Sequence, residues 1–142
     1  MGYTHYWRPT EGIEPTTFAR LSKQAAEVAS LAWSEMDNLE LAFEYDEPER
    51  EPVFSEELIR FNGVEDEGHE TFVLTPGGSD FEFCKTARKP YDTVVVAVLC
   101  LLHHHTEMEV SSDGDPDDWE RGLEFARRIE PKCQLPPKVQ PY

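Results

Sequence analysis

Three basic side chains stand close together in a chain that is otherwise strongly acidic. Lys85, Arg88 and Lys89 fall within five residues of the segment FCKTARKPYD (83–92), although the formal net charge of the 142-residue chain is −16. Arg offers a planar fork of donors that fits a phosphate or carboxylate, and Lys offers a compact positive charge. The field of this segment opposes that of the whole molecule, so it should attract an anion. We therefore expect an anion site at Lys85 and Arg88, although a salt bridge to a neighbouring carboxylate would use either side chain equally well.

The elements that position this segment favour the same interpretation. Residues 81–86 have the character of a strand, in which Phe81, Phe83 and Lys85 share one face that looks buried. Pro90 suits the first turn of a helix that follows. A strand that leads into a helix presents free backbone N–H groups, which bind phosphate readily.

A second polar turn belongs to the same expected site. Ser111, Ser112 and Asp113 end a short strand-like segment and precede a helix. Such a turn can hold a phosphate or a ribose hydroxyl, but capping of the helix explains the same residues. Both turns follow the end of a strand and lead toward a helix, so we expect Lys85, Arg88 and this turn to line one cleft.

Four other side chains complete the predicted ligand site. His5 and Trp7 lie in an aromatic segment that suits stacking on a planar ligand, although aromatic strands are often core. Asn62 precedes Gly63 and could either read the edge of a base or mark a turn. Tyr91 opens the helix after the basic segment. The predicted ligand-binding residues are therefore His5, Trp7, Asn62, Lys85, Arg88, Tyr91, Ser111, Ser112 and Asp113.

The remaining candidates for catalysis or metal binding are weaker. His103, His104 and His105 are consecutive, so on a helix they point about 100° apart and cannot all meet one metal ion. Cys84 stands beside Lys85, but its alternation along the strand allows a buried, inert thiol. The sequence has no P-loop, dinucleotide fingerprint, zinc-protease motif or nucleophile elbow. We therefore predict no catalytic residue, no metal ligand and no cofactor.

Composition and charge limit the class of protein. A chain of 142 residues with 39% hydrophobic residues fits one domain with an adequate core. Three cysteines without a CxxC pair, and a start that lacks the apolar region of a secretory signal, indicate a cytoplasmic protein. The longest apolar run, nine residues, is too short for a bilayer. The acidity disfavours membrane surfaces and direct nucleic-acid binding, and leaves a basic protein partner open.

The hydrophobic periodicity predicts one α+β domain, with a mostly antiparallel sheet of about five strands and with three helices. In residues 39–45 the alternation places Leu39, Leu41, Phe43 and Tyr45 inward. Strands are expected at 3–7, 39–45, 58–64, 69–75, 81–86 and 107–111, the segments 58–64 and 69–75 forming a hairpin.

The helices are expected from 15 to about 36, at 91–104, and around Trp119 to Ile129. The 91–104 helix is apolar all round, so we expect it to be the central, buried helix. The domain is predicted to span residues 1–130, and residues 131–142, which hold four prolines, are predicted to form a Pro-rich C-terminal tail.

Several short blocks together resemble a known group of proteins. The blocks are MGYTHYW at the start, FNG with the following HETF, FCKTARKPYD, and the later SSDG. As a set they are similar to a family of small, largely uncharacterised bacteriophage and mobile-element proteins. The blocks are scattered between residues 1 and 114, so the resemblance covers the fold rather than one loop. It implies a setting, a viral protein in a host bacterial cytoplasm that antagonises host processes or defence, and it implies no reaction.

These observations leave three functions open. We expect a binding protein that sequesters an anionic, nucleotide-like small molecule. The first alternative is an acidic inhibitor or nucleic-acid mimic that docks on a basic host protein through residues 35–70, where fourteen Asp and Glu stand against two Arg. The second is a small nucleotide hydrolase or transferase with Glu70, Asp92 or Asp113 as base. The sequence specifies neither the ligand nor the oligomeric state.

Overall fold

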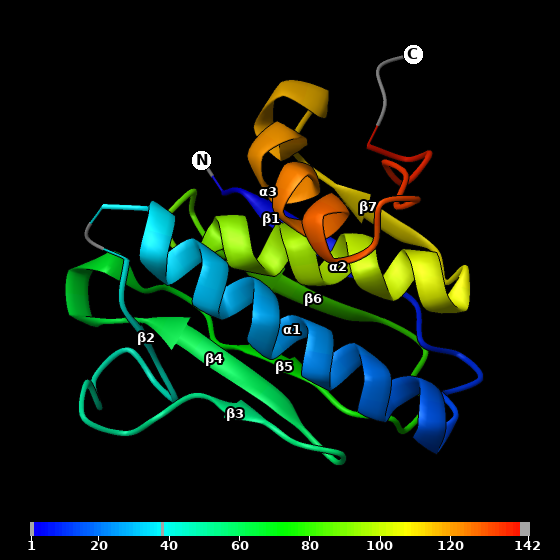
Figure 1. Ribbon diagram of the computed structural model, residues 1–142, viewed down its shortest axis with the longest axis horizontal. Coiled ribbons are helices and arrows are strands. Elements are labelled where there is room, and N and C mark those ends of the chain that lie inside the picture. Colours follow the sequence, from blue (N-terminus) through cyan, green and yellow to red (C-terminus); the bar gives the residue numbers. More distant parts are fainter. Residues whose placement is uncertain (1, 38, 140–142) are drawn as a thin grey trace.

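The computed structural model describes residues 2–37 and 39–139 of the chain. Within these residues the helices are α1 (Pro15–Glu35), α2 (Asp92–Thr106), α3 (Pro116–Ile129) and a short 3-10 helix, η1 (Glu65–Glu67). The strands are β1 (Thr4–Trp7), β2 (Leu41–Ala42), β3 (Val53–Phe54), β4 (Ile59–Gly63), β5 (Phe72–Leu74), β6 (Glu82–Lys85) and β7 (Val110–Ser112). Figure 1 shows their arrangement.

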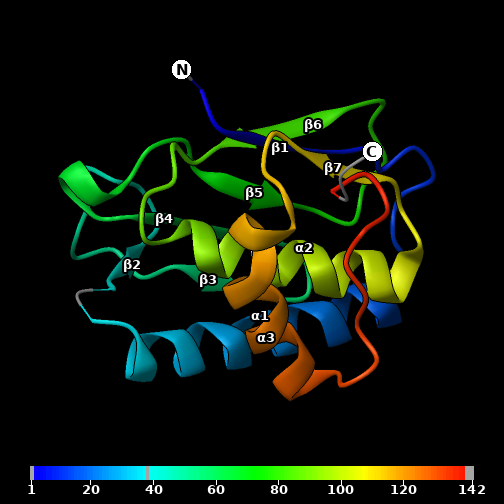
Figure 2. The same ribbon diagram turned by 90° about the horizontal axis from the view of Figure 1, so that it is seen from above.

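The described strands form two antiparallel groups. One is a sheet in the order β6-β1-β7, with β1 at its centre. In the other, β4 pairs with β2, β3 and β5. Figure 2 shows α2 lying between the strands β1, β5, β6 and β7 on one side and α1 on the other, with α3 also packed against α2. The protein is therefore a single α+β domain with three α-helices, and the predicted fold class is confirmed.

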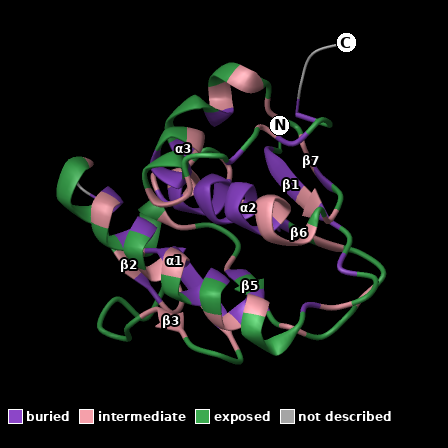
Figure 3. Cartoon of the chain, turned by 45° about the vertical axis from the view of Figure 1, so that its right-hand side comes forward, coloured by how far each residue is buried: buried purple, intermediate pink, exposed green. Residues whose placement is uncertain are grey.

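Helix α2 is the centre of the hydrophobic core. Each of its nine residues from Val94 to Leu102 is at most 1% exposed, and Figure 3 shows the middle of this helix as buried, with residues of intermediate exposure toward its ends. A helix that is apolar all round must be enclosed, and here α1, α3 and the strands enclose it. The prediction of a buried central helix near residues 91–104 is confirmed.

The start of α3 is fixed by a reciprocal cap. The side chain of Asp115 accepts a hydrogen bond from the backbone N–H of Asp118, and the carboxylate of Asp118 accepts one from the backbone N–H of Asp115. Pro116 occupies the first turn, where its missing N–H costs nothing. Capping of this helix, which the sequence left open for Ser111, Ser112 and Asp113, is thus present, but the capping residue is Asp115.

The face predicted for β6 is wrong. Phe81 and Phe83 are 43% and 54% exposed, whereas Cys84 is fully buried. The reason lies in the pairing with β1, which sets Cys84 opposite His5 and Phe83 opposite Tyr6. The inward face of β1 fixes the inward face of β6, and a lone strand's apolar alternation does not reveal this.

The inward alternation predicted for residues 39–45 is only partly confirmed. Leu39 is buried and Leu41 packs against the core, but Ala42 is buried too and Tyr45 is 49% exposed. Phe43 lies between two guanidinium groups, with Arg50 at 3.6 Å and Arg60 at 3.9 Å from its ring centroid. Cation–π contacts can hold an aromatic ring at a surface without burying it in the core.

The hairpin predicted from residues 58–75 is present as β4 and β5, with Ile59 opposite Leu74 and Phe61 opposite Phe72. Its connection contains η1, and the short strand β3, which the sequence did not suggest, pairs with the other edge of β4. No helix in the described part of the chain is long and apolar enough to cross a membrane.

The segment predicted to be a Pro-rich tail packs on the domain along its described part. Cys133 and Val139 are buried, and Lys138 forms an isolated bridge beside Ser111 of β7. Residues 140–142, the end of the predicted tail, lie outside the described residues.

The close approach of α2 and α3 provides a test of this packing. A Cβ on Gly122 of α3 would lie 2.4 Å from Cγ1 of Val96 and 3.0 Å from the carbonyl oxygen of Thr93 on α2. Alanine raises helix propensity by about 1 kcal/mol, but overpacking costs about 1–3 kcal/mol. Since a backbone carbonyl cannot easily move aside, the cost should exceed the gain, and we expect Gly122→Ala to lower the free energy of unfolding by up to about 2 kcal/mol in urea titrations.

Gly77→Ala is the matched control. Gly77 is exposed, and the nearest atom to an added Cβ is the hydroxyl oxygen of Thr75 at 3.9 Å. This change should leave the unfolding midpoint nearly unaltered. A Gly122→Ala protein more stable than the wild type would contradict the packing of α3 on α2.

Candidate functional site

The two predicted parts of the site flank the start of β1. In the sheet, Lys85 at the end of β6 lies opposite Thr4, and Ser112 at the end of β7 lies opposite His5. Because β1 runs antiparallel to both neighbours, the ends of β6 and β7 meet at its beginning. The basic segment after β6 and the polar turn after β7 therefore lie on either side of one short strand.

A hollow of about 400 Å³ opens at this place. It is lined by Gly2, Tyr3, Ala87, Arg88 and Asp113. Arg88 and Asp113, predicted from separate segments, thus border one hollow.

The side chain of Lys85 adjoins this hollow at Gly2. Its Nζ lies 3.2 Å from the position that a Cβ on Gly2 would take. Among the described residues, Lys85 forms no ion pair within 4.0 Å. The ammonium group therefore keeps its donors for another partner.

Arg88 holds the other edge of the hollow. Its guanidinium lies 4.0 Å from the ring centroid of Tyr3 and donates to Oδ1 of Asp118. Its backbone is left-handed, with φ of 59°, and follows Ala87 with φ of 52°. Burial, the largest single effect, raises the pKa of the Asp118 carboxyl, but the hydrogen bonds from Arg88 and Asp115 and the charge of Arg88 together hold that pKa below its usual value. A salt bridge, which the sequence left open, is thus present at Arg88.

Tyr3 lies against the Arg88 guanidinium in the lining of the hollow, and its hydroxyl is unpaired. The residue is 4% exposed, and no hydrogen-bond partner of the buried hydroxyl occurs among the described residues. Ser112 lies near it, but the Ser112 hydroxyl already has three partners. Burial, followed by the negative charges of Asp92 and Asp118, raises the pKa of Tyr3. The phenol therefore stays protonated and keeps an unused O–H donor.

A chain of buried hydrogen bonds lies behind the hollow. Nε2 of His5 is 2.6 Å from Oδ1 of Asp92, and Nδ1 of His5 is 2.8 Å from Oγ of Ser112. The hydroxyl of Thr86 also donates to Oδ1 of Asp92, at 2.6 Å. The imidazole is fully buried. These bonds connect β1, the start of α2 and the end of β7.

The order of groups in this chain, Ser112–His5–Asp92, resembles a nucleophilic triad. The hydroxyl of Ser112, however, accepts hydrogen bonds from the backbone N–H of Gly114 at 2.8 Å and from Nε1 of Trp119 at 3.1 Å. Both acceptor lone pairs are occupied, so its own proton points to Nδ1 of His5, and Nε2–H of His5 donates to Asp92. An oxygen with no free lone pair is a poor nucleophile, and the arrangement is that of a structural network.

Four residues predicted to touch a ligand are enclosed, which corrects their expected role. His5, Trp7, Asn62 and Tyr91 are each at most 1% exposed. His5 belongs to the network above, and Trp7 packs against Phe72 with 5.3 Å between ring centroids. A side chain with no accessible surface cannot contact a ligand in this structure.

Asn62 and Tyr91 hold neighbouring segments together. The amide of Asn62 donates to the carbonyl of His69 and accepts from the backbone N–H groups of Gly63 and His69. The hydroxyl of Tyr91 donates to the carbonyl of Glu70. Asn62 therefore shapes the β4–β5 connection, the turn role that the sequence left as its alternative.

Ser111 and Ser112 also depart from the expected site. Ser111 lies opposite Tyr6 and beside Lys138, on the face of the sheet away from the hollow's buried network. Ser112 is a member of that network rather than of the lining. Of the nine predicted residues, Arg88 and Asp113 line the hollow, and Lys85 lies on the outer face of the sheet with its ammonium group beside Gly2.

Sequence reasoning missed Gly2, Tyr3 and Ala87 as lining residues and Asp118 as the partner of Arg88. Tyr3 shares strand parity with His5, and this alternation was its only signal in the sequence. Asp118 had no such signal, because its contact with Arg88 spans 30 residues and depends on where α3 packs.

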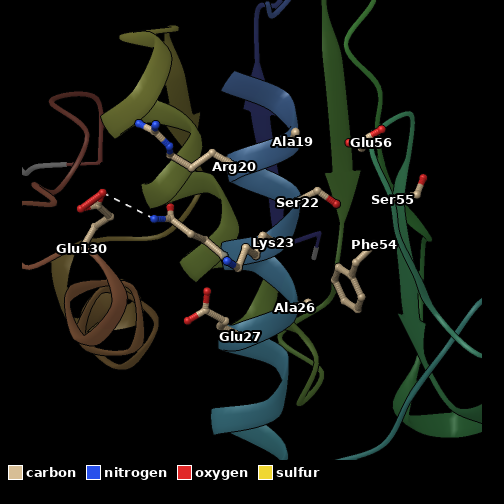
Figure 4. A pocket seen from close by; sticks show the side chains of 11 residues that line it. Ala19, Arg20, Ser22, Lys23, Ala26, Glu27, Phe54, Ser55, Glu56 and Glu130 are labelled. Atoms are coloured by element: carbon tan, nitrogen blue, oxygen red, sulfur yellow. Dashed lines mark hydrogen bonds between the residues drawn. The ribbon is translucent and has the colours of Figure 1, made fainter. Parts of the chain in front are cut away.

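A larger hollow, of about 850 Å³, lies between α1 and β3 (Figure 4). Its charged lining mixes both signs, with Arg20 and Lys23 against Glu27, Glu56 and Glu130. The hydroxyl of Ser22 in its wall is buried and has no partner among the described residues. None of the predicted ligand residues lines it.

The chain matches no protein-family model, no curated protein and no solved structure.

The buried network predicts a sharp contrast between two adjacent serines. Ser112→Ala leaves Nδ1 of His5, Nε1 of Trp119 and the N–H of Gly114 without a partner, and each unsatisfied buried group costs about 1–3 kcal/mol. We expect Ser112→Ala to lower the free energy of unfolding by at least about 2 kcal/mol. Ser111→Ala, which removes no side-chain hydrogen bond among the described residues, should change it by less than about 0.5 kcal/mol.

Chemical denaturation of both variants distinguishes a structural role of the Ser112 hydroxyl from a role as a nucleophile. Replacing a serine that serves only as a nucleophile leaves the stability nearly unchanged, whereas replacing a serine that holds a buried hydrogen-bond network lowers it. Equal stability of the Ser111→Ala and Ser112→Ala proteins would contradict the structural role.

Proposed function

We propose that the protein binds an anionic, nucleotide-like small molecule in the hollow between β1, the segment after β6 and the turn after β7. The observation that carries the proposal is the position of two weakly used cations at this hollow. The half-exposed Arg88 guanidinium borders it, and the Lys85 ammonium, which forms no ion pair among the described residues, lies beside Gly2 in its lining. Phosphate groups accept hydrogen bonds from such donors.

The charges around the hollow set the conditions for binding. Lys85 and Arg88 are opposed by Asp118, which pairs with Arg88, and by Asp113, whose carboxylate accepts from the N–H of Thr4 and the hydroxyl of Tyr6. An anion must therefore compete with Asp118 for Arg88. The Arg88 side chain is 59% exposed, and an ion pair at such a surface is worth only about 0–1 kcal/mol. The competition is thus one that a phosphate can win.

The role of this binding follows from the resemblance rather than from the hollow. A phage protein in a bacterial cytoplasm that binds a host ligand without reacting with it would act by sequestration. The occupied lone pairs of Ser112 support binding over hydrolysis.

The ligand can be sought directly. Protein purified from a bacterial host and then denatured should release a compound with nucleotide absorbance, identified by mass spectrometry. We expect its amount to fall in the Arg88→Ala protein prepared in parallel. Release of the same amount from both proteins would place the compound elsewhere and refute the site.

Three substitutions at the hollow should change the affinity for AMP and for pyrophosphate, measured by calorimetry. Arg88→Ala and Lys85→Ala should each weaken binding by about tenfold to 150-fold, the equivalent of the 1.5–3 kcal/mol of a charge-assisted hydrogen bond. Asp118→Asn should strengthen binding, because it frees Arg88 while its amide oxygen can still accept from the N–H of Asp115 in the cap of α3.

Lys132→Ala is the control, since it removes an equal charge from an exposed position beyond α3. It should leave the affinity within about twofold. An Arg88→Ala protein that unfolds, or an Asp118→Asn protein that binds both anions more weakly, would contradict the proposal.

A second candidate function is docking on a basic protein, and one observation favours it. The backbone N–H of Glu65 donates to the carbonyl of Tyr45, which brings the exposed acidic turn 46–51 beside the acidic residues of η1. The negative charges of the two acidic segments are therefore concentrated at one end of the molecule. Such a concentration of charge attracts a basic surface at long range.

Neutralising the acidic turn tests this candidate. Glu47→Gln, Glu49→Gln and Glu51→Gln combined should weaken binding to a polylysine peptide at low salt, with little effect at high salt, because exposed charges are screened over about 8 Å at physiological ionic strength. The control combines Glu11→Gln, Glu27→Gln and Glu120→Gln, which are exposed elsewhere. If both triple variants bind equally, net charge alone explains the attraction and the turn is only a loop.

A further inference from the structure

A cluster of metal-binding side chains lies outside the site described above. His104 and His105 belong to the last turn of α2, and Glu130 follows the end of α3. One ligand atom from each of these residues lies within 4.8 Å of the other two. The three consecutive histidines do not all meet: Nδ1 of His103 bonds to the carbonyl oxygen of Met108 instead.

The geometry of the cluster is close to that of a bound ion. Oε2 of Glu130 lies 3.8 Å from Nε2 of His104 and 3.9 Å from Nε2 of His105. Ligand atoms about 2.1 Å from a tetrahedral Zn²⁺ are separated from one another by about 3.4 Å. The two distances from Glu130 exceed this value by about half an ångström, and all three ligand atoms lie within 4.8 Å of one another, so small side-chain shifts would bring them to coordination distances.

A fourth polar group is already in place. Oε1 of Gln24 on α1 is 2.7 Å from Nε2 of His105, and the amide nitrogen of Gln24 is 3.5 Å from Oε2 of Glu130. When His105 binds an ion through Nε2, its ring carries the proton on Nδ1, and the Gln24 oxygen no longer has that donor. This oxygen is then free to approach the ion. Figure 4 shows Glu130 joined by a dashed hydrogen bond to the side chain that reaches from α1.

The surroundings favour a cation on balance. The cluster lies at the carboxyl end of α2, where the helix dipole is negative. The formal net charge of the chain is −16. The positive charge of Arg20, which acts on His105, opposes an ion at this place. The side chains of His105, His104 and Glu130 are only 9%, 27% and 27% exposed, so the ligands are partly shielded and held by packing.

We propose that His104, His105 and Glu130 form a binding site for one divalent transition-metal ion of the Zn²⁺ type, with Gln24 as a further oxygen donor. Two imidazoles and one carboxylate suit Zn²⁺ and disfavour Mg²⁺, which prefers oxygen ligands. Since the ligands come from α2 and the end of α3, with Gln24 on α1, the ion ties the three helices together at the end distant from the start of α2. This site is independent of the proposed anion site.

Binding of Zn²⁺ to the purified, chelator-treated protein tests the proposal. We expect one equivalent of Zn²⁺ to compete with a chromophoric chelator, and Mg²⁺ to be ineffective. Glu130→Gln and His104→Ala should each weaken Zn²⁺ binding at least about tenfold, because loss of even an outer partner of a metal ligand costs 10–100-fold. Co²⁺ bound in place of Zn²⁺ should show the intense visible bands of tetrahedral coordination.

Two comparisons make the result decisive. His69→Asn removes an exposed histidine from the β4–β5 connection and should leave the affinity unchanged. Glu130→Gln is isosteric, so it tests the site even if a histidine variant fails to fold, and circular dichroism verifies its fold. Zn²⁺ binding that is unaltered in Glu130→Gln, that is lost in His69→Asn, or that is absent from the wild type would overturn the proposal.

Discussion

A buried imidazole with both nitrogens satisfied is the constraint on which the rest of this structure depends. His5 lies in the central strand of its sheet, and its two bonds reach Asp92 at the start of the core helix and Ser112 at the end of β7. A buried polar group that loses its partner costs about 1–3 kcal/mol, so the three elements are held in one relative position. Thr86 and Trp119 extend the same network to the basic segment and to α3.

The hollow is a consequence of this arrangement. The segment after β6 must turn to bring Thr86 onto Asp92, and the left-handed backbone of Ala87 and Arg88 follows directly. The turn after β7 must bring Gly114 over Ser112. These two turns leave Arg88 and Asp113 facing each other across Tyr3. A buried polar network thus positions the charged side chains of Arg88 and Asp113 at the hollow.

Much of the fold could be predicted from the sequence, because its strongest patterns act locally. The apolar run of α2, the capped start of α3 and the β4–β5 hairpin could each be predicted from the sequence. The faces of the short strands could not. Phe83 points outward because β1 dictates which side of β6 is buried, and that pairing joins residues about 80 positions apart.

The site was predictable only in part, for the same physical reason. A basic cluster stands out in an acidic chain, so Lys85 and Arg88 are visible in the sequence as candidates. Burial of His5, Asn62 and Tyr91 depends on tertiary contacts, and their polar groups serve the fold. The pairing of Arg88 with Asp118 and the meeting of His104 with Glu130 join α3 to other elements, and no local pattern encodes them.

The central claim, that the network-supported hollow beside Tyr3 receives an anion, is tested most directly by the amide nitrogen–proton correlation spectrum recorded during a titration with AMP. The account predicts that the largest shifts occur at the amides of Tyr3, Ala87, Arg88 and Asp113. Resonances of the acidic turn 46–51 and of the hollow beside α1 should stay in place. Unchanged resonances around Tyr3 at saturating AMP, or shifts confined to another face, would contradict it.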